Sequence, residues 1–238
     1  MMSQIIPISL AWSGGKDSVY ALHMLNETPG YQVIRLHTTF GEETRRVGLH
    51  GIHESLIQKQ ASLIGLPLDS IYYPATGDNQ AYEHAMSIYF KKLKVQGIAH
   101  IGFGDIYLED LKQYREKQLH KAGMKPVFPL WGKNTLQTVN EIIQCGFLTL
   151  ICAADADKID EGWLGKALSK EFLDALNPDV DPCGENGEFH TFCIDGPIFS
   201  EKLPIKLGET LKKSYSFQDS DGKVLEKQFW FKNIKLID

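Results

Sequence analysis

The feature that most constrains this chain is a glycine pair placed between an apolar strand and an amphipathic helix. The strand is predicted over Ile5–Ala11, and the helix after it extends to about Asn26. Between them, residues 13–18 read Ser-Gly-Gly-Lys-Asp-Ser. Glycines let the backbone turn sharply and expose its N–H groups, and the N-terminus of the following helix adds partial positive charge. The pattern predicts an anion-binding turn at the carboxyl edge of a sheet.

The alternation of strand and helix continues through the first half of the chain. Helices are predicted to end at Gly65, to begin after an N-cap at Asp78, and to span about residues 111–122. Further strands are predicted over residues 31–40, 70–73 and 98–103. Repeated strand–helix units of this length favour an α/β fold, with a parallel sheet covered on both faces.

The pattern changes near Pro129. Helices are predicted around Leu136–Ile143 and over Trp163–Leu176, with a strand near Leu148–Ala153 between them. The remaining β-like stretches are residues 188–194, 213–218 and 224–237, the last two flanking a turn at 219–222. We therefore expect two domains: residues 1–129, which carry the anion-binding turn, and a smaller α+β domain over residues 130–238.

Charge and cysteine content narrow the class of protein. The formal net charge is −5 and the sequence isoelectric point is about 5.9, so nothing points to nucleic acid or to an anionic membrane. The four cysteines are widely spaced without a CxxC pair, which argues against a zinc site or a dithiol redox centre. The N-terminus lacks the charged start of a signal peptide, and no apolar run approaches the roughly 18 residues that span a bilayer. We expect a cytoplasmic protein without membrane or nucleic-acid partners.

The glycine-rich turn suits phosphate chemistry. Lys16 offers a cation to phosphate oxygens, and Asp17 could hold Mg²⁺ beside them or simply cap the helix. The turn does not match the longer GxxxxGK[ST] motif. The competing interpretation is a glycine-rich strand–helix turn of the kind found in any α/β protein. The residues expected to bind phosphate are Ser13, Gly14, Gly15, Lys16, Asp17 and Ser18.

Two downstream motifs add further candidate site residues. Gly104-Asp105 follows a predicted strand and could line a pocket, or could cap the next helix. Glu185 and Glu188 lie three residues apart in a glycine-flanked loop. Such carboxylates suit an ammonium, a metal or a substrate amine, and the competing interpretation is a polar turn that leads into a strand.

Taken in order, SGGKDS, GDI, PLWGKNT, LGKAL and CGENGEFHTF resemble the diphthine–ammonia ligase-like family of PP-loop ATPases. These N-type ATP pyrophosphatases are also described as the domain of unknown function 71 group. The resemblance covers about residues 8–199. It implies a HUP-type, Rossmann-like parallel sheet of strand order 3-2-1-4-5, joined to a smaller C-terminal α+β domain.

The resemblance also implies a reaction. ATP, with Mg²⁺, would be split into AMP and pyrophosphate to activate a carboxylate acceptor, and ammonia or an amine would then form an amide. The catalytic residues that the resemblance implies are Lys16, Asp17, Glu185 and Glu188. It also adds Gly104 and Asp105 to the expected nucleotide site and makes Asp17 the expected metal ligand. Where family members have GEGGE(Y/F)ET, this chain has Asn186 and His190. The acceptor is therefore not fixed by the resemblance.

Other interpretations stay open. A regulatory protein of the same fold could bind ATP or AMP without chemistry, whereas a tRNA-thiolating relative is expected to bring paired cysteines and a basic surface, which are missing here. A homodimer is compatible with the sequence. His50, His53, Arg45, Arg46 and Cys183 could serve structure or the site.

Overall fold

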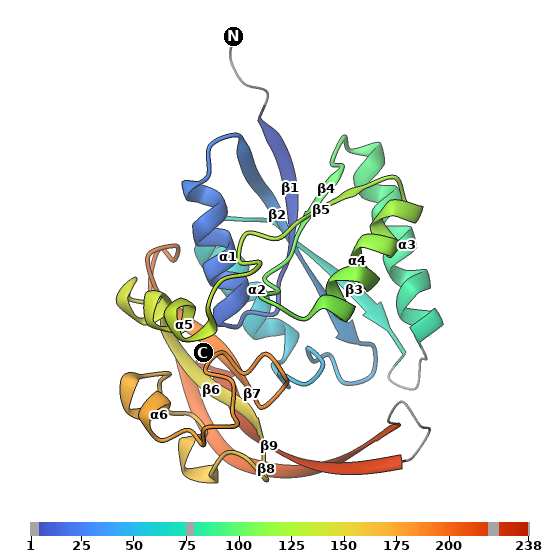
Figure 1. Ribbon diagram of the computed structural model, residues 1–238. Coiled ribbons are helices and arrows are strands. Elements are labelled where there is room, and N and C mark those ends of the chain that lie inside the picture. The colour runs from blue at the N-terminus through green and yellow to red at the C-terminus, as the bar shows by residue number, and fades with distance from the viewer. Residues whose placement is uncertain (1–4, 75–78, 219–223, 238) are drawn as a thin grey trace.

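The computed structural model describes residues 5–74, 79–218 and 224–237. Its first half forms a parallel sheet in the order β3-β2-β1-β4-β5, which confirms the order implied by the resemblance (Figure 1). The strands are β1 (Ile6–Ala11), β2 (Tyr31–Gly41), β3 (Leu68–Tyr73), β4 (His100–Gly102) and β5 (Lys125–Val127). The order reverses between β1 and β4, and open α/β sheets bind ligands at such a switch point.

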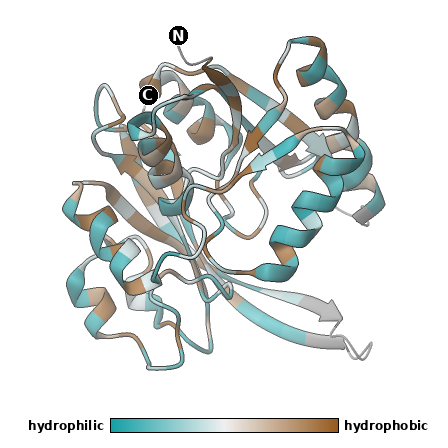
Figure 2. Ribbon diagram, turned by 45° about the horizontal axis from the view of Figure 1, so that its top comes forward, coloured by the Kyte–Doolittle hydropathy of each residue, from teal (hydrophilic) through white to brown (hydrophobic). Residues whose placement is uncertain are grey.

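Helices cover both faces of this sheet, as the strand–helix alternation predicts. The four helices are α1 (Lys16–Glu27), α2 (Glu54–Ile64), α3 (Asn79–Val95) and α4 (Glu109–Lys121). Apolar side chains of α1 and α2 pack in one core, and those of α3 and α4 pack in a second core that also includes Ile101 of β4. Figure 2 shows the hydrophobic residues of the strands enclosed between helices whose outer faces are hydrophilic.

The second half forms an antiparallel sheet in the order β7-β6-β9-β8. Its strands are β6 (Leu148–Asp155), β7 (Phe189–Asp195), β8 (Ile205–Gln218) and β9 (Val224–Leu236). Two α-helices, α5 (Thr135–Gln144) and α6 (Lys170–Asp174), and the 3-10 turn η1 (Glu161–Trp163) complete it. The chain is thus an α/β fold with a smaller, mainly antiparallel second part.

The two sheets share a core. Residues of β1, α1, β6 and β7 belong to one continuous buried cluster. Backbone hydrogen bonds also cross between the halves, from Cys193 N to Gly14 O at 2.8 Å and from Ser200 N to Leu63 O at 2.9 Å. The division into domains at residues 129 and 130 stays a prediction.

Some expected elements differ in the structure. The helix predicted over Trp163–Leu176 is wrong: only Lys170–Asp174 is α-helical, because Gly165 is left-handed (φ +84°) and Ala167 bridges to Leu150 of β6. Residue periodicity alone also missed β5, which has only three residues. The N-cap expected at Asp78 and the turn expected at residues 219–222 lie outside the described residues.

Candidate nucleotide and acceptor site

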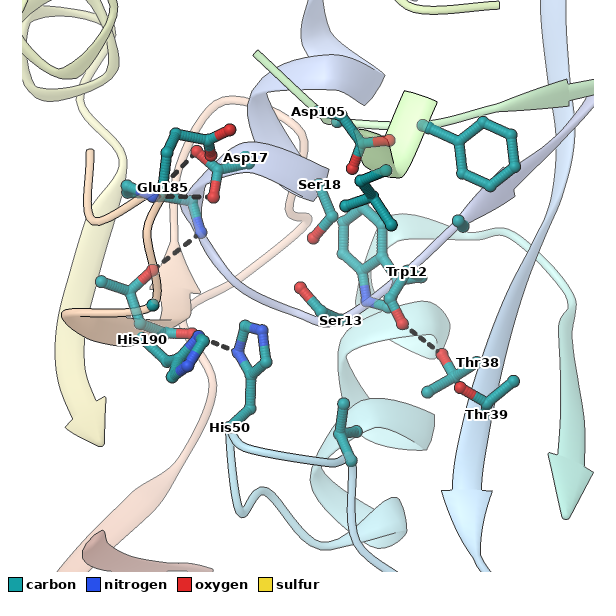
Figure 3. A pocket seen from close by; sticks show the side chains of 18 of the residues that line it. Trp12, Ser13, Asp17, Ser18, Thr38, Thr39, His50, Asp105, Glu185 and His190 are labelled. Atoms are coloured by element: carbon teal, nitrogen blue, oxygen red, sulfur yellow. Dashed lines mark hydrogen bonds and ion pairs between the residues drawn. The ribbon is translucent and has the colours of Figure 1, made fainter. Parts of the chain in front are cut away.

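A cavity of about 350 Å³ opens at the carboxyl ends of β1, β2 and β4 (Figure 3). Its lining comes from both halves of the chain: the glycine-rich turn and Asp105 on one side, and Gly184, Glu185, Gly187 and residues 189–191 on the other. The volume falls within the roughly 300–1,000 Å³ of small-molecule sites. The cavity therefore lies where the switch point of the parallel sheet predicts a ligand.

The glycine-rich turn is held by the antiparallel sheet. Gly14 is left-handed (φ +78°), and its carbonyl accepts hydrogen bonds from Cys193 N at 2.8 Å and Gln60 Nε2 at 3.1 Å. The N–H of Lys16 donates to Thr191 Oγ1 at 3.0 Å. A Cβ on Gly15 would lie 2.8 Å from the carbonyl oxygen of Thr191, which explains the second glycine. Gly15, the N-cap residue of α1, has no side chain to cap the helix, and Thr191 Oγ1 takes the N–H of Lys16; the helix N-terminus otherwise favours an anion.

Lys16 and Asp17 form a buried ion pair beside the turn. The ammonium lies 2.9 and 2.7 Å from the two carboxylate oxygens, and the Lys16 side chain is only 4% exposed. Burial, the largest single influence, would lower the pKa of Lys16, but the charge and hydrogen bonds of Asp17 together with the charges of Cys183 and Glu185 outweigh it, so the pKa is raised and the ammonium stays charged. An incoming phosphate would therefore share this cation with Asp17.

The hydroxyls of the turn differ in what they can still donate. Ser18 Oγ donates its hydrogen to Gly15 O at 2.9 Å, whereas Ser13 Oγ accepts from Gly15 N at 3.3 Å. A hydroxyl has one hydrogen. In this arrangement Ser13, and not Ser18, keeps its hydrogen for a ligand, and both serines line the cavity.

The structure brings Glu185 into the cavity but not Glu188. Glu185 Oε2 accepts from Ile106 N at 3.2 Å, and Figure 3 shows the carboxyl beside Asp17. Burial, reinforced by the charge of Asp17, raises the pKa of Glu185 to about 7. Glu188 is 2% exposed and points into its own loop. Its Oε1 accepts from Asn186 Nδ2 at 3.0 Å and from Asp181 N at 3.3 Å, with Lys158 Nζ at 3.8 Å.

Gly104 and Asp105 both lie at the cavity, for different reasons. A Cβ on Gly104 would lie 2.9 Å from the backbone carbon and oxygen of Asp17, so glycine is required for β4 to approach α1. Asp105 is paired with Arg115, whose Nε lies 2.6 Å from Oδ2. Arg115 also lines the cavity, and sequence analysis missed it because it follows Asp105 by ten positions on a separate helix.

Two neutral histidines form another wall that sequence analysis left without a role. The rings of His50 and His190 are 4.7 Å apart between centroids, and Figure 3 shows them side by side. His50 Nδ1 lies 3.2 Å from Thr191 O, and since a carbonyl only accepts, Nδ1 carries the hydrogen. Burial and the nearby Lys16 cation lower the pKa of His50 to about 4. His190 Nε2 is buried with no hydrogen-bond partner among the described residues.

The other residues whose roles the sequence left undecided have structural roles or lie outside the cavity. His53 caps α2 by accepting from Ser55 N at 3.3 Å. Arg45 lies 4.2 Å from the Tyr72 ring centroid, and neither it nor Arg46 lines this cavity. The thiol of Cys183 is buried, which raises its pKa to about 12, so it is not a thiolate at neutral pH.

The side chains that line the cavity are compatible with a metal ion that binds mainly through the phosphates of a nucleotide. Among residues 5–74, 79–218 and 224–237, no three His, Cys, Asp or Glu side chains are grouped to hold a metal ion. Mg²⁺ usually binds through one or two carboxylates together with substrate phosphates. Asp17, beside the phosphate turn, fits that mode and not an all-protein site. In the described part of the chain, no helix combines the length and apolar character needed to cross a membrane.

Comparison with known proteins places both halves in one family. The diphthamide synthase N-terminal domain matches residues 7–126, and the diphthamide synthase C-terminal domain matches residues 134–227. Together the two matches cover most of the chain, and they meet around the cavity described above.

Individual relatives with similarity over most of the chain carry a related name. A diphthine–ammonia ligase of Homo sapiens is 28% identical over 226 residues, covering 84% of this chain and 82% of the relative. That of Bos taurus is 28% identical over 229 residues, covering 85% and 84%. Among solved structures, the U34-tRNA thiolase NcsA from Methanococcus maripaludis, with its [4Fe-4S] cluster, matches at 16% sequence identity. The match covers 60% of this chain and 58% of that one, with a TM-score of 0.36. This similarity is too low to carry an argument. The family matches, which span both halves of the chain, show that it belongs to the diphthamide synthase family.

Proposed function

We propose that this chain is an ATP-dependent ligase that adenylates a carboxylate, releases pyrophosphate, and passes the acyl group to ammonia or an amine. The observation that carries the proposal is the cluster of Lys16, Asp17 and Glu185 around the N-terminus of α1, inside one cavity. A cation and a helix terminus suit a phosphate, and a carboxyl with a pKa near neutrality suits proton transfer. Membership of the family and the names of the relatives support the ligase class.

ATP would lie along the cavity from its apolar wall to the glycine-rich turn. Ala11, Met86 and Phe103 line the cavity and offer an apolar surface to the adenine. Lys16 and the N–H groups at the start of α1 would contact the phosphates. Mg²⁺, bound by phosphate oxygens beside Asp17, would supply positive charge.

In the first step, an acceptor carboxylate oxygen attacks the α-phosphorus, and the bond to the bridging oxygen breaks to release pyrophosphate. Negative charge grows on the leaving group in this step. Lys16 and the helix N-terminus are already in place to stabilise that charge, without reorganisation of solvent. Because Asp17 holds the ammonium, the cation is positioned before the nucleotide binds.

In the second step, ammonia or an amine attacks the acyl carbon, AMP leaves, and one proton must be removed from the nitrogen. Glu185 is the candidate base, since with a pKa of about 7 it is partly ionised at neutral pH. Glu188 becomes a positioning residue, whose carboxylate holds the loop that carries Glu185. We retain residues 1–129 as the nucleotide part and 130–238 as the acceptor part, with the cavity between them.

The proposal is tested by product stoichiometry. The protein, ATP, Mg²⁺ and ¹⁵N-ammonium are incubated with fractionated peptides and metabolites that carry carboxylates. We expect AMP and pyrophosphate in equal amounts, together with ¹⁵N-amide in one fraction. Nucleotide binding without release of either product, whatever the fraction, would instead indicate the regulatory alternative.

A further inference from the structure

A second cavity, of about 370 Å³, lies against the loop between β2 and α2. This loop, residues 42–53, is a wall common to both cavities. Val47 and His50 line the nucleotide cavity, whereas Arg46, Leu49 and Gly51 line the second one. The opposite wall is the β8–β9 hairpin, through Lys213, Tyr215 and Phe231.

The charged residues that line this second cavity are all basic. The chain carries 30 acidic residues, yet none of the described residues that line the cavity is Asp or Glu. Arg46 and Lys213 line it, and neither forms an ion pair with any carboxylate in the described ranges. A third cation, Lys232, borders it with its ammonium 3.3 Å from Thr210 Oγ1. Unpaired cations facing one cavity favour an anion there.

The wall that carries Arg46 is rigid. Backbone hydrogen bonds close the loop on itself, from Val47 N to Ile52 O at 2.9 Å and from Gly51 N to Val47 O at 2.8 Å. The Arg46 guanidinium donates to Gly51 O at 2.6 Å, which uses one of its five N–H groups. The cation is therefore held in place before any ligand arrives, which reduces the entropy lost on binding.

The backbone of this loop is strained next to Arg46. Arg45 has φ +54°, and among the described residues it is the one non-glycine residue with a positive φ. This conformation is unfavourable for residues with a side chain, and such strain gathers at functional sites. It lets Arg45 stack on Tyr72, 4.2 Å from the ring centroid, while Arg46 lines the cavity.

The hairpin wall indicates what the anion is attached to. Tyr73, Tyr215 and Phe231 give an apolar, aromatic lining. The Lys213 ammonium lies 5.6 Å from the Phe231 ring centroid, so the cation lies next to the aromatic lining. The volume is that of a small molecule, near the lower end of the range for ligand sites.

We propose that this cavity is a second binding site, for a small anionic ligand that carries a carboxylate or phosphate on an apolar, ring-sized body. The fork of Arg46 and the Lys213 ammonium bind the oxyanion, since guanidinium groups match carboxylate and phosphate geometry. Leu49, Tyr215 and Phe231 pack on the apolar body. The ligand is separated from the nucleotide cavity by the thickness of loop 42–53.

The test uses the ¹⁵N-labelled protein and three probes: phenyl phosphate, phenylacetate and benzyl alcohol. We expect saturable shifts of the amides of Gly48, Gly51 and Asn233 with one or both anions, and none with the neutral alcohol. The stronger anion identifies the charged group. Equal binding of benzyl alcohol, no shift with any probe, or shifts confined to Gly14 and Gly15 would overturn the proposal.

Adjacent lysines on β8 provide a matched pair of variants. Lys213→Gln removes a cavity cation, and we expect about tenfold weaker binding of the preferred anion because one charge-assisted contact is lost. Lys212→Gln removes the same charge on the opposite face, where its ammonium lies 4.7 Å from the Trp230 centroid, and leaves affinity unchanged. Equal losses in both variants would mean general attraction to a basic hairpin and would refute the site. Both lysines are exposed, so folding is preserved.

Discussion

The two turns that face each other across the nucleotide cavity differ in what holds them in place. The turn at residues 13–18 is shaped by its backbone: two glycines, and hydrogen bonds to Cys193, Gln60 and Thr191. The loop at residues 181–188 also turns at two glycines, Gly184 (φ +66°) and Gly187 (φ +81°), but its own side chains hold it in addition. Asp181 Oδ1 accepts from the N–H groups of Cys183 and Glu185 at 2.9 and 3.2 Å, and Glu188 accepts from Asp181 and Asn186.

The difference matters because the same residue type does different work in the second loop. Glu185 and Glu188 are three residues apart and chemically alike, but one faces the cavity and the other holds the loop. In a sequence, a glycine pair indicates a turn by itself. A carboxylate residue does not indicate whether its side chain binds a substrate or a backbone N–H.

The largest effect is expected at Glu185. Glu185→Gln removes the proposed base, so we expect amide formation to fall by ~100-fold or more, with ATP affinity little changed. Glu188→Gln should instead weaken the buried hydrogen bonds of the loop, lowering stability by about 1–3 kcal/mol while product per folded molecule is largely kept. Measuring the turnover rate and the free energy of unfolding of both variants distinguishes the catalytic role of one glutamate from the structural role of the other. If the two variants behaved alike in both measurements, the distinction between the glutamates would be lost.

Next in size is the effect of Lys16→Ala on nucleotide binding. Loss of one charge-assisted contact should weaken ATP by about 1.5–3 kcal/mol, and AMP by less, since Lys16 is expected at the β and γ phosphates. Calorimetric titration with each nucleotide measures the difference. Equal losses for ATP and AMP would place the lysine at the α-phosphate instead. Lys133→Ala, a lysine bound to Glu141 away from the cavity, is the control and should change neither affinity.

A smaller effect concerns pH. Burial raises the pKa of Glu185 from 4.5 to about 7, so between these values the folded protein holds a proton that the unfolded chain releases. Its contribution to stability is therefore present below pH 4.5 and is lost as pH rises towards 7. Allowing for solvent screening of a half-buried group, we expect wild type to lose about 1–2 kcal/mol more than Glu185→Gln over this interval. Unfolding curves at pH 5 and pH 8 test the sign, which would be reversed if Lys16 kept Glu185 ionised.

The smallest effect is expected at the hydrogen bond that braces the phosphate turn against Thr191 of β7. Thr191→Val keeps the shape of the side chain but leaves the N–H of Lys16 without its acceptor, at a cost of about 1 kcal/mol. We expect a modest loss of both stability and ATP affinity, because the brace belongs to the phosphate turn. Thr191→Ser restores the hydroxyl and should recover both. If the valine variant bound ATP as tightly as wild type, the phosphate turn would keep its conformation without the hydrogen bond to Thr191.

The parallel half of the fold was predictable because its signals are local. Apolar strands, helix caps and the glycine pair each lie within a few residues of the element they specify, and the resemblance supplied the strand order. The helix expected over Trp163–Leu176 failed because segment 165–168 bonds to β6, a contact that no local pattern reports. In β5, three residues give periodicity too little length to detect.

The site was predictable only where one segment builds it. Lys16 and Asp17 were expected together and are together. The neighbours that complete the cavity, His50 and Arg115, come from a loop and a helix whose distance from the turn is set by tertiary packing. Glu188 was misplaced for a different reason: carboxylate spacing in a loop does not say which way each side chain points.

The bond between Lys16 N and Thr191 Oγ1 joins positions 175 residues apart. During synthesis, the phosphate turn therefore emerges from the ribosome long before the strand that braces it. The parallel sheet can form early from short-range contacts, but the turn reaches its final geometry only when β7 arrives. A chain interrupted before residue 191 would hold every residue of the phosphate motif and still present an unfinished nucleotide site, so this chain gains that site last.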